Sequence, residues 1–239
     1  MRLHVVLLIV VTSSLTGCAT TFTTARPADF FSANRNTGDD LQGSLFTSDA
    51  AVLSDSDLTR ILEYKYSAPA QSRIALLPFG WNTWSGWSEE MAVSTSAVDA
   101  DVLSTLRASP RIYDASFLPS ILIPETRKLP FLREAAARYQ ADLLLAFRSS
   151  CQSFQRYRLL SDTTRAWCSV EAILLDVRTG LVPFAASSTQ NFQAEEADED
   201  LNFRETVMRA QLESIASALG EISEAIVEFV EPGVGGQAL

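Results

Sequence analysis

The sequence predicts one α/β (α+β) sandwich: a mixed β-sheet with helices packed on it, ending in a three-strand antiparallel meander and a long C-terminal helix. Three features predict this fold. Residues 73–79 form an apolar run closed by proline and glycine, as expected of a strand buried on both faces. Residues 150–192 contain strand-like segments separated by turn residues. Residues 200–230 repeat apolar side chains at steps of three and four, which indicates an amphipathic helix.

The first half of the predicted domain alternates helices and strands. A short helix begins at Ser54 or Asp55, either of which can cap it. After the strand at 73–79, a second helix begins at Ser88, where two glutamates follow and suit the positive end of the helix dipole. Pro110 ends this helix, and a short strand-like segment comes directly after it.

The second half changes to neighbouring strands. A helix is predicted over 129–140, with proline at a first-turn position, and an apolar central strand over 142–149. Three further strand segments are predicted at 150–159, 165–177 and 181–192. Because turn residues join them, we expect an antiparallel meander.

The N-terminus has the three parts that are typical of a secretory signal. Residues 1–17 combine an arginine, a short apolar run and small residues before Cys18. The apolar run is far shorter than the ~20 residues that a membrane-spanning helix needs. The Leu-Thr-Gly-Cys ending resembles the lipobox, which implies cleavage before Cys18 and acylation of its thiol. The alternative is an ordinary secreted protein with a chance cysteine near its cleavage site.

Cleavage at this place would make Cys18 the first residue of the mature chain. Residues 18–53 are polar and without periodicity, which predicts a flexible tether. The domain is predicted at 54–231 and a disordered tail at 232–239. Ala19, rather than aspartate, follows the cysteine and resembles an outer-membrane sorting signal. We therefore expect a lipid anchor in the outer membrane and a domain that faces the periplasm.

Composition excludes several classes of function. The formal net charge of −10 disfavours nucleic acid and anionic lipid headgroups as partners, so membrane attachment should come from the lipid. The single histidine, His4, lies in the predicted signal, which excludes histidine-dependent nucleophiles, bases and metal sites in the mature chain. No phosphate loop, metal motif or nucleophile elbow occurs. We expect no cofactor and no metal; carboxylate and Ser-Lys chemistry stay open.

Cys151 and Cys168 form an even pair once Cys18 carries lipid, and in an oxidising periplasm such a pair predicts a disulfide. A hairpin centred near residue 160 would place the two cysteines almost opposite each other. Two cysteines without a nearby histidine cannot complete a zinc site. Free buried thiols are the alternative.

Three short motifs are similar to a known family. Residues 73–79 (RIALLPF) resemble the opening strand of the TolB amino-terminal-like domain, which CsgG-type envelope lipoproteins share. Residues 136–145 (AARYQADLLL) resemble a helix-to-strand junction of that domain, and residues 175–180 (LDVRTG) resemble one of its hairpin turns. The likeness spans roughly 54–230 and implies the fold. It also implies proteins of envelope assembly, secretion or regulation that act through protein contacts.

Trp81, Trp84 and Trp87 stand three residues apart in the connection after the first buried strand, and they form a candidate partner-binding loop. The alternative is that their rings cover the end of the sheet. The acidic run at 195–200 could bind a divalent cation, but a solvated link before the last helix is the commoner arrangement. The last helix could pair with a second subunit or pack on its own sheet.

Together these features predict a non-enzymatic, lipid-anchored envelope protein that binds protein partners in assembly, secretion or maintenance. One alternative is a carboxylate-dependent hydrolase of cell-wall glycan. Another is a subunit of an oligomeric, secretion-channel-like assembly, so homo-oligomerisation stays open. The segment 150–192 carries several charged side chains and lacks the clean alternating apolar face of membrane-inserted strands, which counts against pore formation.

Overall fold

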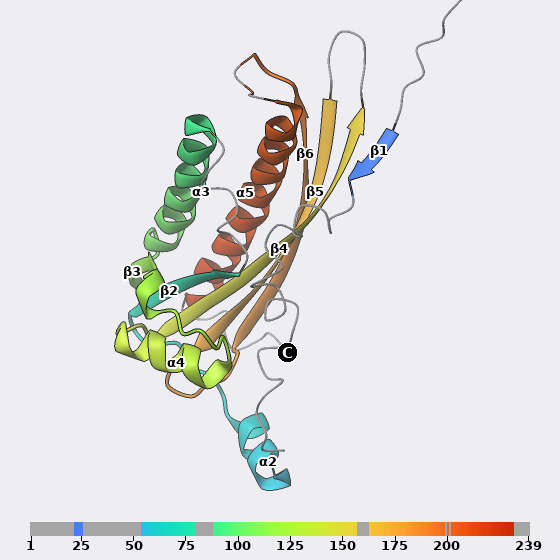
Figure 1. The fold of residues 1–239 in the computed structure, drawn as a ribbon. Helices are drawn as coiled ribbons and strands as arrows, with labels where there is room; N and C mark the ends of the chain where they lie inside the picture. Colours follow the sequence, from blue (N-terminus) through green and yellow to red (C-terminus); the bar gives the residue numbers. More distant parts are fainter. Residues whose placement is uncertain are drawn as a thin grey trace, which may run out of the picture.

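The structure, a computed structural model, describes residues 22–25, 54–79, 88–156, 163–198, 200 and 202–231. In chain order its elements are β1 (Phe22–Ala25), α2 (Asp55–Glu63), β2 (Ser72–Phe79), α3 (Glu89–Arg107), β3 (Ile112–Phe117), the 3-10 helix η3 (Ser120–Leu122), α4 (Leu129–Arg138), β4 (Leu143–Arg156), β5 (Thr163–Asp176), β6 (Phe184–Glu195) and α5 (Phe203–Val230). They form a mixed sheet with helices on both faces (Figure 1), so the predicted fold class is confirmed.

The sheet has the strand order β3-β2-β4-β5-β6, and β1 pairs with the end of β4. β2 is parallel to β3 and β4, whereas β4, β5 and β6 form the predicted antiparallel meander. The segments predicted at 142–149 and 150–159 prove to be one strand, because no turn residue separates them. β4 pairs with β2 along its first half and with β1 along its last four residues. β1 itself lies within the predicted tether.

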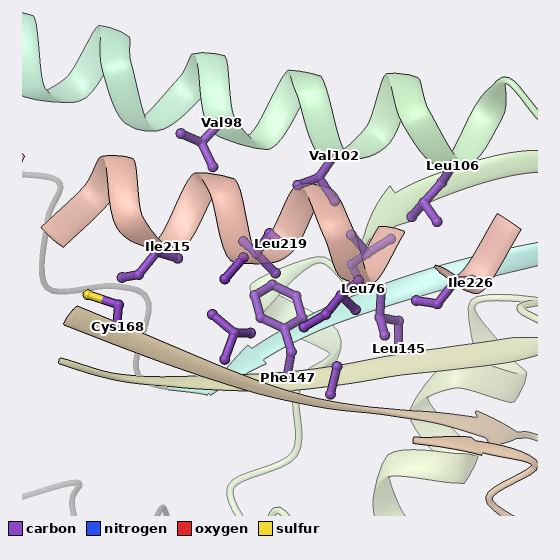
Figure 2. Close-up of a cluster of buried hydrophobic side chains, with 14 of the residues drawn as sticks. Leu76, Val98, Val102, Leu106, Leu145, Phe147, Cys168, Ile215, Leu219 and Ile226 are labelled. Atoms are coloured by element: carbon purple, nitrogen blue, oxygen red, sulfur yellow. The ribbon is translucent and has the colours of Figure 1, made fainter. Parts of the chain in front are cut away.

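α5 and α3 pack on one face of the sheet. Apolar side chains of both helices, among them Val102 and Leu219, meet Leu76 and Phe147 of the sheet in one buried cluster (Figure 2). On the opposite face, α4 packs Leu132 against the start of β4 and the end of β5. α4 therefore covers only that end of the meander, and it does not reach the rest of this face.

Local sequence signals set the helix ends. The Ser88 hydroxyl accepts a hydrogen bond from the Met91 N–H at 3.1 Å and caps α3, as predicted. Asn202 caps α5 in the same way, accepting from the Arg204 N–H at 3.0 Å, so the helix begins a few residues later than predicted. Pro130 lies in the first turn of α4, where its missing N–H costs nothing.

The three motifs of the family resemblance meet at one end of the sheet. The Asp142 carboxylate accepts a hydrogen bond from the Arg73 N–H at 2.9 Å and another from the Arg178 guanidinium. The Asp176 carboxylate accepts from the Thr179 hydroxyl at 2.6 Å and closes the turn that follows β5. These polar residues thus join β2, β4 and β5, which is a structural role.

α2 stands apart from the sheet, at the end of the molecule opposite β1 (Figure 1). None of its residues is buried, and Leu62 is 84% exposed. Among the helices of the described ranges, none combines the length and the apolar character that a membrane crossing requires.

Candidate functional site

The meander leaves one of its faces open beyond α4. Side chains alternate along each strand, so Cys168 and Val170 of β5 lie in the core while their neighbours point to the opposite side. We define the open face as the exposed side chains of Arg148, Phe154, Arg165, Trp167, Glu171 and Gln193. Because all six are exposed, no helix of the described ranges covers this face.

Two aromatic rings form the centre of the open face. Phe154 and Trp167 are diagonal neighbours on β4 and β5, and their ring centroids lie 5.2 Å apart at an interplanar angle of 88°. Their side chains remain 43% and 36% exposed. The Arg165 guanidinium lies 5.6 Å from the Trp167 ring, within the range of a cation–π contact. The site therefore combines large apolar surface with a cation.

Polar groups surround these rings. Arg165 donates a hydrogen bond to the Gln193 side-chain oxygen at 2.7 Å. Arg148 and Glu171 form an ion pair at 2.7 Å, with both side chains at least half exposed. Such a surface pair adds little to stability, so both charges stay accessible to a partner. The open face thus carries both signs of charge and neutral hydrogen-bonding groups.

A disulfide fixes the strands that carry the open face. Cys151 and Cys168 pair directly in the β4–β5 register and are bonded to each other, as predicted. Cys168 is fully buried beneath α5 and neighbours Trp167 in the chain. A slip of one residue between the strands would turn Trp167 into the core, and the disulfide prevents it.

A buried polar contact supports the same region from the α5 side. The Gln211 amide nitrogen donates a hydrogen bond to the Ser153 hydroxyl at 2.7 Å, and both residues are buried. The Ser214 hydroxyl donates to the Ala166 carbonyl at 3.2 Å. Because a buried polar group without a partner is costly, these bonds fix how α5 lies on β4 and β5.

The acidic run at 195–200 contributes to the start of α5. The Asp200 carboxylate accepts hydrogen bonds from Arg209 and Thr206, both at 2.7 Å, and from the Ala197 N–H at 2.9 Å. Burial favours the protonated carboxyl, but these hydrogen bonds outweigh it and hold the pKa of Asp200 below its usual value. Asp200 lies in the segment between β6 and α5, and its ion pair with Arg209 fixes this segment to α5.

Several predicted site residues lie outside the described residues. These are Cys18 and the three tryptophans of the candidate loop, Trp81, Trp84 and Trp87. That loop connects the end of β2 at Phe79 to the α3 cap at Ser88. The structure therefore tests neither the lipid attachment nor the role of the loop, and both stay predictions. Of the predicted site residues, it brings together Cys151 and Cys168.

Sequence reasoning missed the aromatic pair of the open face. A signal exists in β5, where Thr164, Ala166 and Cys168 alternate with the polar or bulky Arg165 and Trp167. A tryptophan in the polar register of an alternating strand points to an exposed ring. This alternation along β5 could have predicted that Trp167 is exposed.

The comparisons place the chain near several bacterial proteins of known structure. No protein-family model and no curated protein matches the sequence. The PelC dodecamer of Paraburkholderia phytofirmans is 16% identical, with 66% of this chain and 91% of that chain covered and a TM-score of 0.35. Lipoprotein GNA1162 of Neisseria meningitidis is 14% identical, with 66% of this chain and 97% of that chain covered and a TM-score of 0.29. The LpoB C-terminal domain of Salmonella enterica is 10% identical, with 55% of this chain and 90% of that chain covered and a TM-score of 0.26. These TM-scores carry no argument about function.

Proposed function

We propose that this protein is a non-enzymatic, lipid-anchored component of the bacterial envelope that binds a protein partner through the open face. The observation that carries the proposal is the pair Phe154 and Trp167, exposed on a sheet face and ringed by polar groups. Aromatic residues and arginine are the side chains most enriched at the centres of protein interfaces.

The rigidity of the open face also supports protein binding. Its strands are joined by a disulfide and backed by a buried core. A surface that is ordered before binding loses less side-chain and backbone entropy when a partner docks. The charged pair of Arg148 and Glu171 lies beside the aromatic centre, where it can favour one orientation of the partner.

The positions of the carboxylates support a non-enzymatic role. Glycoside hydrolysis requires two cooperating carboxyl groups on either side of the scissile bond. Of the six side chains that define the open face, Glu171 is the one carboxylate, and it is paired with Arg148. Glu195 of β6 is exposed on the same side, but its partner Thr163 stands far from Glu171 along β5, roughly 27 Å at about 3.4 Å per residue. Asp142 and Asp200 are engaged in the ion pairs that join structural elements. Burial raises the pKa of the Asp99 carboxyl on α3, which lies outside the open face.

Two features support the envelope as the compartment. The lipobox-like ending at Cys18 implies export and acylation. The disulfide between Cys151 and Cys168 suits an oxidising compartment such as the periplasm. Replacement of Cys18 by serine should release the protein from membranes, which fractionation and fatty-acid labelling would measure. Continued acylation of that variant would show that the anchor lies elsewhere.

Site-specific photo-crosslinking tests the binding site. A photoreactive amino acid at Ser169, beside Trp167 on the same side of β5, should give one specific protein adduct in membranes of the producing bacterium. Trp167→Ala should abolish this adduct. Tyr113→Ala is the matched control, because Tyr113 is also exposed, at 58%, but lies on β3 at the far edge of the sheet. Equal loss in both variants would contradict the proposal.

An activity assay tests the non-enzymatic part of the proposal. The purified protein, incubated with peptidoglycan, should release no soluble fragments above a heat-denatured control. Release of fragments that depends on an acidic residue of this chain would establish the hydrolase alternative instead.

A further inference from the structure

The outer edge of β6 is open in the described structure. β6 pairs with β5 along all of its residues, from Phe184 opposite Leu174 to Glu195 opposite Thr163, without a shift of register. Among the described ranges, no strand pairs with its other edge, because β6 is the last strand of the sheet (Figure 1). Within the described ranges no strand bonds its outward N–H and C=O groups, and at the last residue of β6 the Glu195 carbonyl accepts a hydrogen bond from Arg209 at 2.9 Å.

This edge lacks the usual protections against strand pairing. Proteins blunt an exposed edge with short strands, lysine, proline or a bulge. β6 has 12 residues (FAASSTQNFQAE), contains neither lysine nor proline, and carries its single charge at the last residue, Glu195. The opposite edge strand, β3, has 6 residues and pairs with β2 through a register shift. The contrast marks β6 as the edge suited to accept another strand.

An acidic flank of α5 adjoins this edge. The Glu221 carboxylate accepts hydrogen bonds from Ser188 at 2.6 Å and from Gln190, both on the α5 side of β6. These bonds hold the pKa of Glu221 below its usual value, so the group stays ionised. Glu224 and Glu228 follow at helical spacing, are exposed, and form no ion pair with any described residue. α5 carries no lysine or arginine after Arg209.

We propose that the outer edge of β6 binds an extended segment of a partner protein that carries lysine or arginine at alternate positions. The added strand would pair with β6 through its backbone, and alternate side chains would point to the α5 side. There they would meet the carboxylates of Glu221, Glu224 and Glu228. The proposal rests on the proposed function in that the ligand is a protein, but it uses a surface other than the open face.

Charge favours such a segment over a second copy of this chain. α5 lies over β5 and β6, as its contacts with Ala166 and Ser188 show. If two β6 strands paired at the usual spacing of about 4.8 Å, the two α5 helices would lie roughly 10 Å apart. Their glutamate flanks would then face each other, and like charges at that distance repel. A strand that carries lysine or arginine would instead be attracted to the glutamates of α5.

A defined peptide tests the proposal with the full chain in detergent. The probe is an eight-residue peptide of alternating lysine and valine, with a glutamate–valine peptide as its charge control. We expect the lysine peptide to bind and to slow hydrogen exchange at the backbone amides of β6, and the glutamate peptide to do neither. Equal binding of the two peptides, or protection confined to other strands, would overturn the proposal.

Modified peptides test the backbone pairing without any risk to the protein fold. N-methyl groups on the valine amides block one edge of the peptide, and N-methyl groups on the lysine amides block the other. One of these two peptides should lose binding and the other should retain it. Retention by both would show that the peptide attaches by charge alone, which contradicts strand addition.

Charge variants of α5 complete the test. Glu224→Gln with Glu228→Gln should weaken binding of the lysine peptide about fivefold, as expected for the loss of two surface ion pairs. Glu89→Gln with Glu90→Gln changes net charge equally in the first turn of α3 and should have little effect. Trp167→Ala should leave peptide binding unchanged. If the lysine peptide does not bind while the Trp167-dependent crosslinked adduct persists, the proposal for the β6 edge is wrong and the proposed function stands.

Discussion

Cys151 and Cys168 lie directly opposite each other in β4 and β5, with Cα atoms 4.1 Å apart and a bond between their sulfurs. The bond joins two strands whose opposite side carries Phe154 and Trp167. The same pair of strands thus carries the fully buried Cys168 on one side and the exposed rings of Phe154 and Trp167 on the other.

Removal of this disulfide should destabilise the protein. For a sequence separation of 17 residues, loop-closure entropy predicts a loss of about 3 kcal/mol in the free energy of unfolding. Cys151→Ala with Cys168→Ala, measured by urea denaturation, should show this loss. Wild type in excess reductant is the control and should match the double variant. A stability equal to that of the oxidised wild type would show that the bond adds nothing.

The hydrogen bonds of Asp142, which join the three motifs of the family resemblance, should contribute to stability alone. Asp142→Ala removes the acceptor of the Arg73 N–H and of the Arg178 guanidinium, so the free energy of unfolding should fall by about 2 kcal/mol. Glu134→Ala breaks an exposed ion pair with Arg138 and should cost less than about 1 kcal/mol. Below its melting temperature, the Asp142 variant should still give the Ser169 crosslink. Loss of that crosslink in a folded variant would assign the motif a functional role.

The Asp200 ion pair predicts a dependence of stability on acid pH. Since folding lowers the pKa of Asp200 from its ordinary 3.8, its contribution is complete above that pH. The contribution is lost as the pH falls through the lower pKa of the folded state. Asp200→Asn should therefore be less stable than wild type by about 2 kcal/mol at neutral pH, and the gap should close below pH ~4.

Asp198→Asn is the control for this experiment, because Asp198 is exposed and near in sequence. Urea denaturation at a series of pH values measures the gap for both variants. A constant gap for Asp200→Asn across the acid range would contradict the assignment.

Tyr66 predicts a dependence on alkaline pH. Burial and the nearby Asp176 carboxylate raise the pKa of its hydroxyl from 10.0 to about 12, and the buried hydroxyl has no hydrogen-bond partner among the described residues. Because the folded state favours the neutral phenol, this contribution is complete below pH 10 and is lost between pH 10 and about 12. Tyr66→Phe should abolish that part of the alkaline loss.

At neutral pH the Tyr66→Phe variant should differ from wild type by less than about 1 kcal/mol, since it removes an unpaired polar group. Tyr113→Phe, with its ring 58% exposed, should follow wild type throughout. Denaturant curves between pH 8 and 12 measure all three proteins. Identical alkaline loss in wild type and Tyr66→Phe would rule out Tyr66 as the responsible group.

Periodicity predicted most of the fold because burial follows it closely. The step pattern of α5 corresponds to its buried face, and the turn residues after β5 end that strand as expected. The cysteine pairing followed from the position of one hairpin. β1 was missed because four residues of pairing leave no periodic pattern in the sequence.

The open face was missed for a tertiary reason. Alternation in β5 separates its two sides, but it does not say which helix covers each side or how far that helix reaches. α4 ends after Arg138 and covers only the region around Leu144 and Leu175. Whether Trp167 is buried or exposed depends on this reach, which no local pattern encodes.

The pairing of β1 with β4 bears on how the domain stands at the bilayer. Phe22, the first residue of β1, pairs with Arg156 at the end of the meander, and Phe22 follows the proposed anchor Cys18 by four residues. Four extended residues span at most about 14 Å. If Cys18 carries the proposed lipid, the connection between the anchor and the sheet is therefore much shorter than the predicted tether, and it would hold the Phe154 end of the meander near the headgroups. α2 lies at the end of the molecule opposite β1 (Figure 1), so it would then be far from the membrane. With that anchor, the proposed partner would approach the open face from the side, next to the membrane.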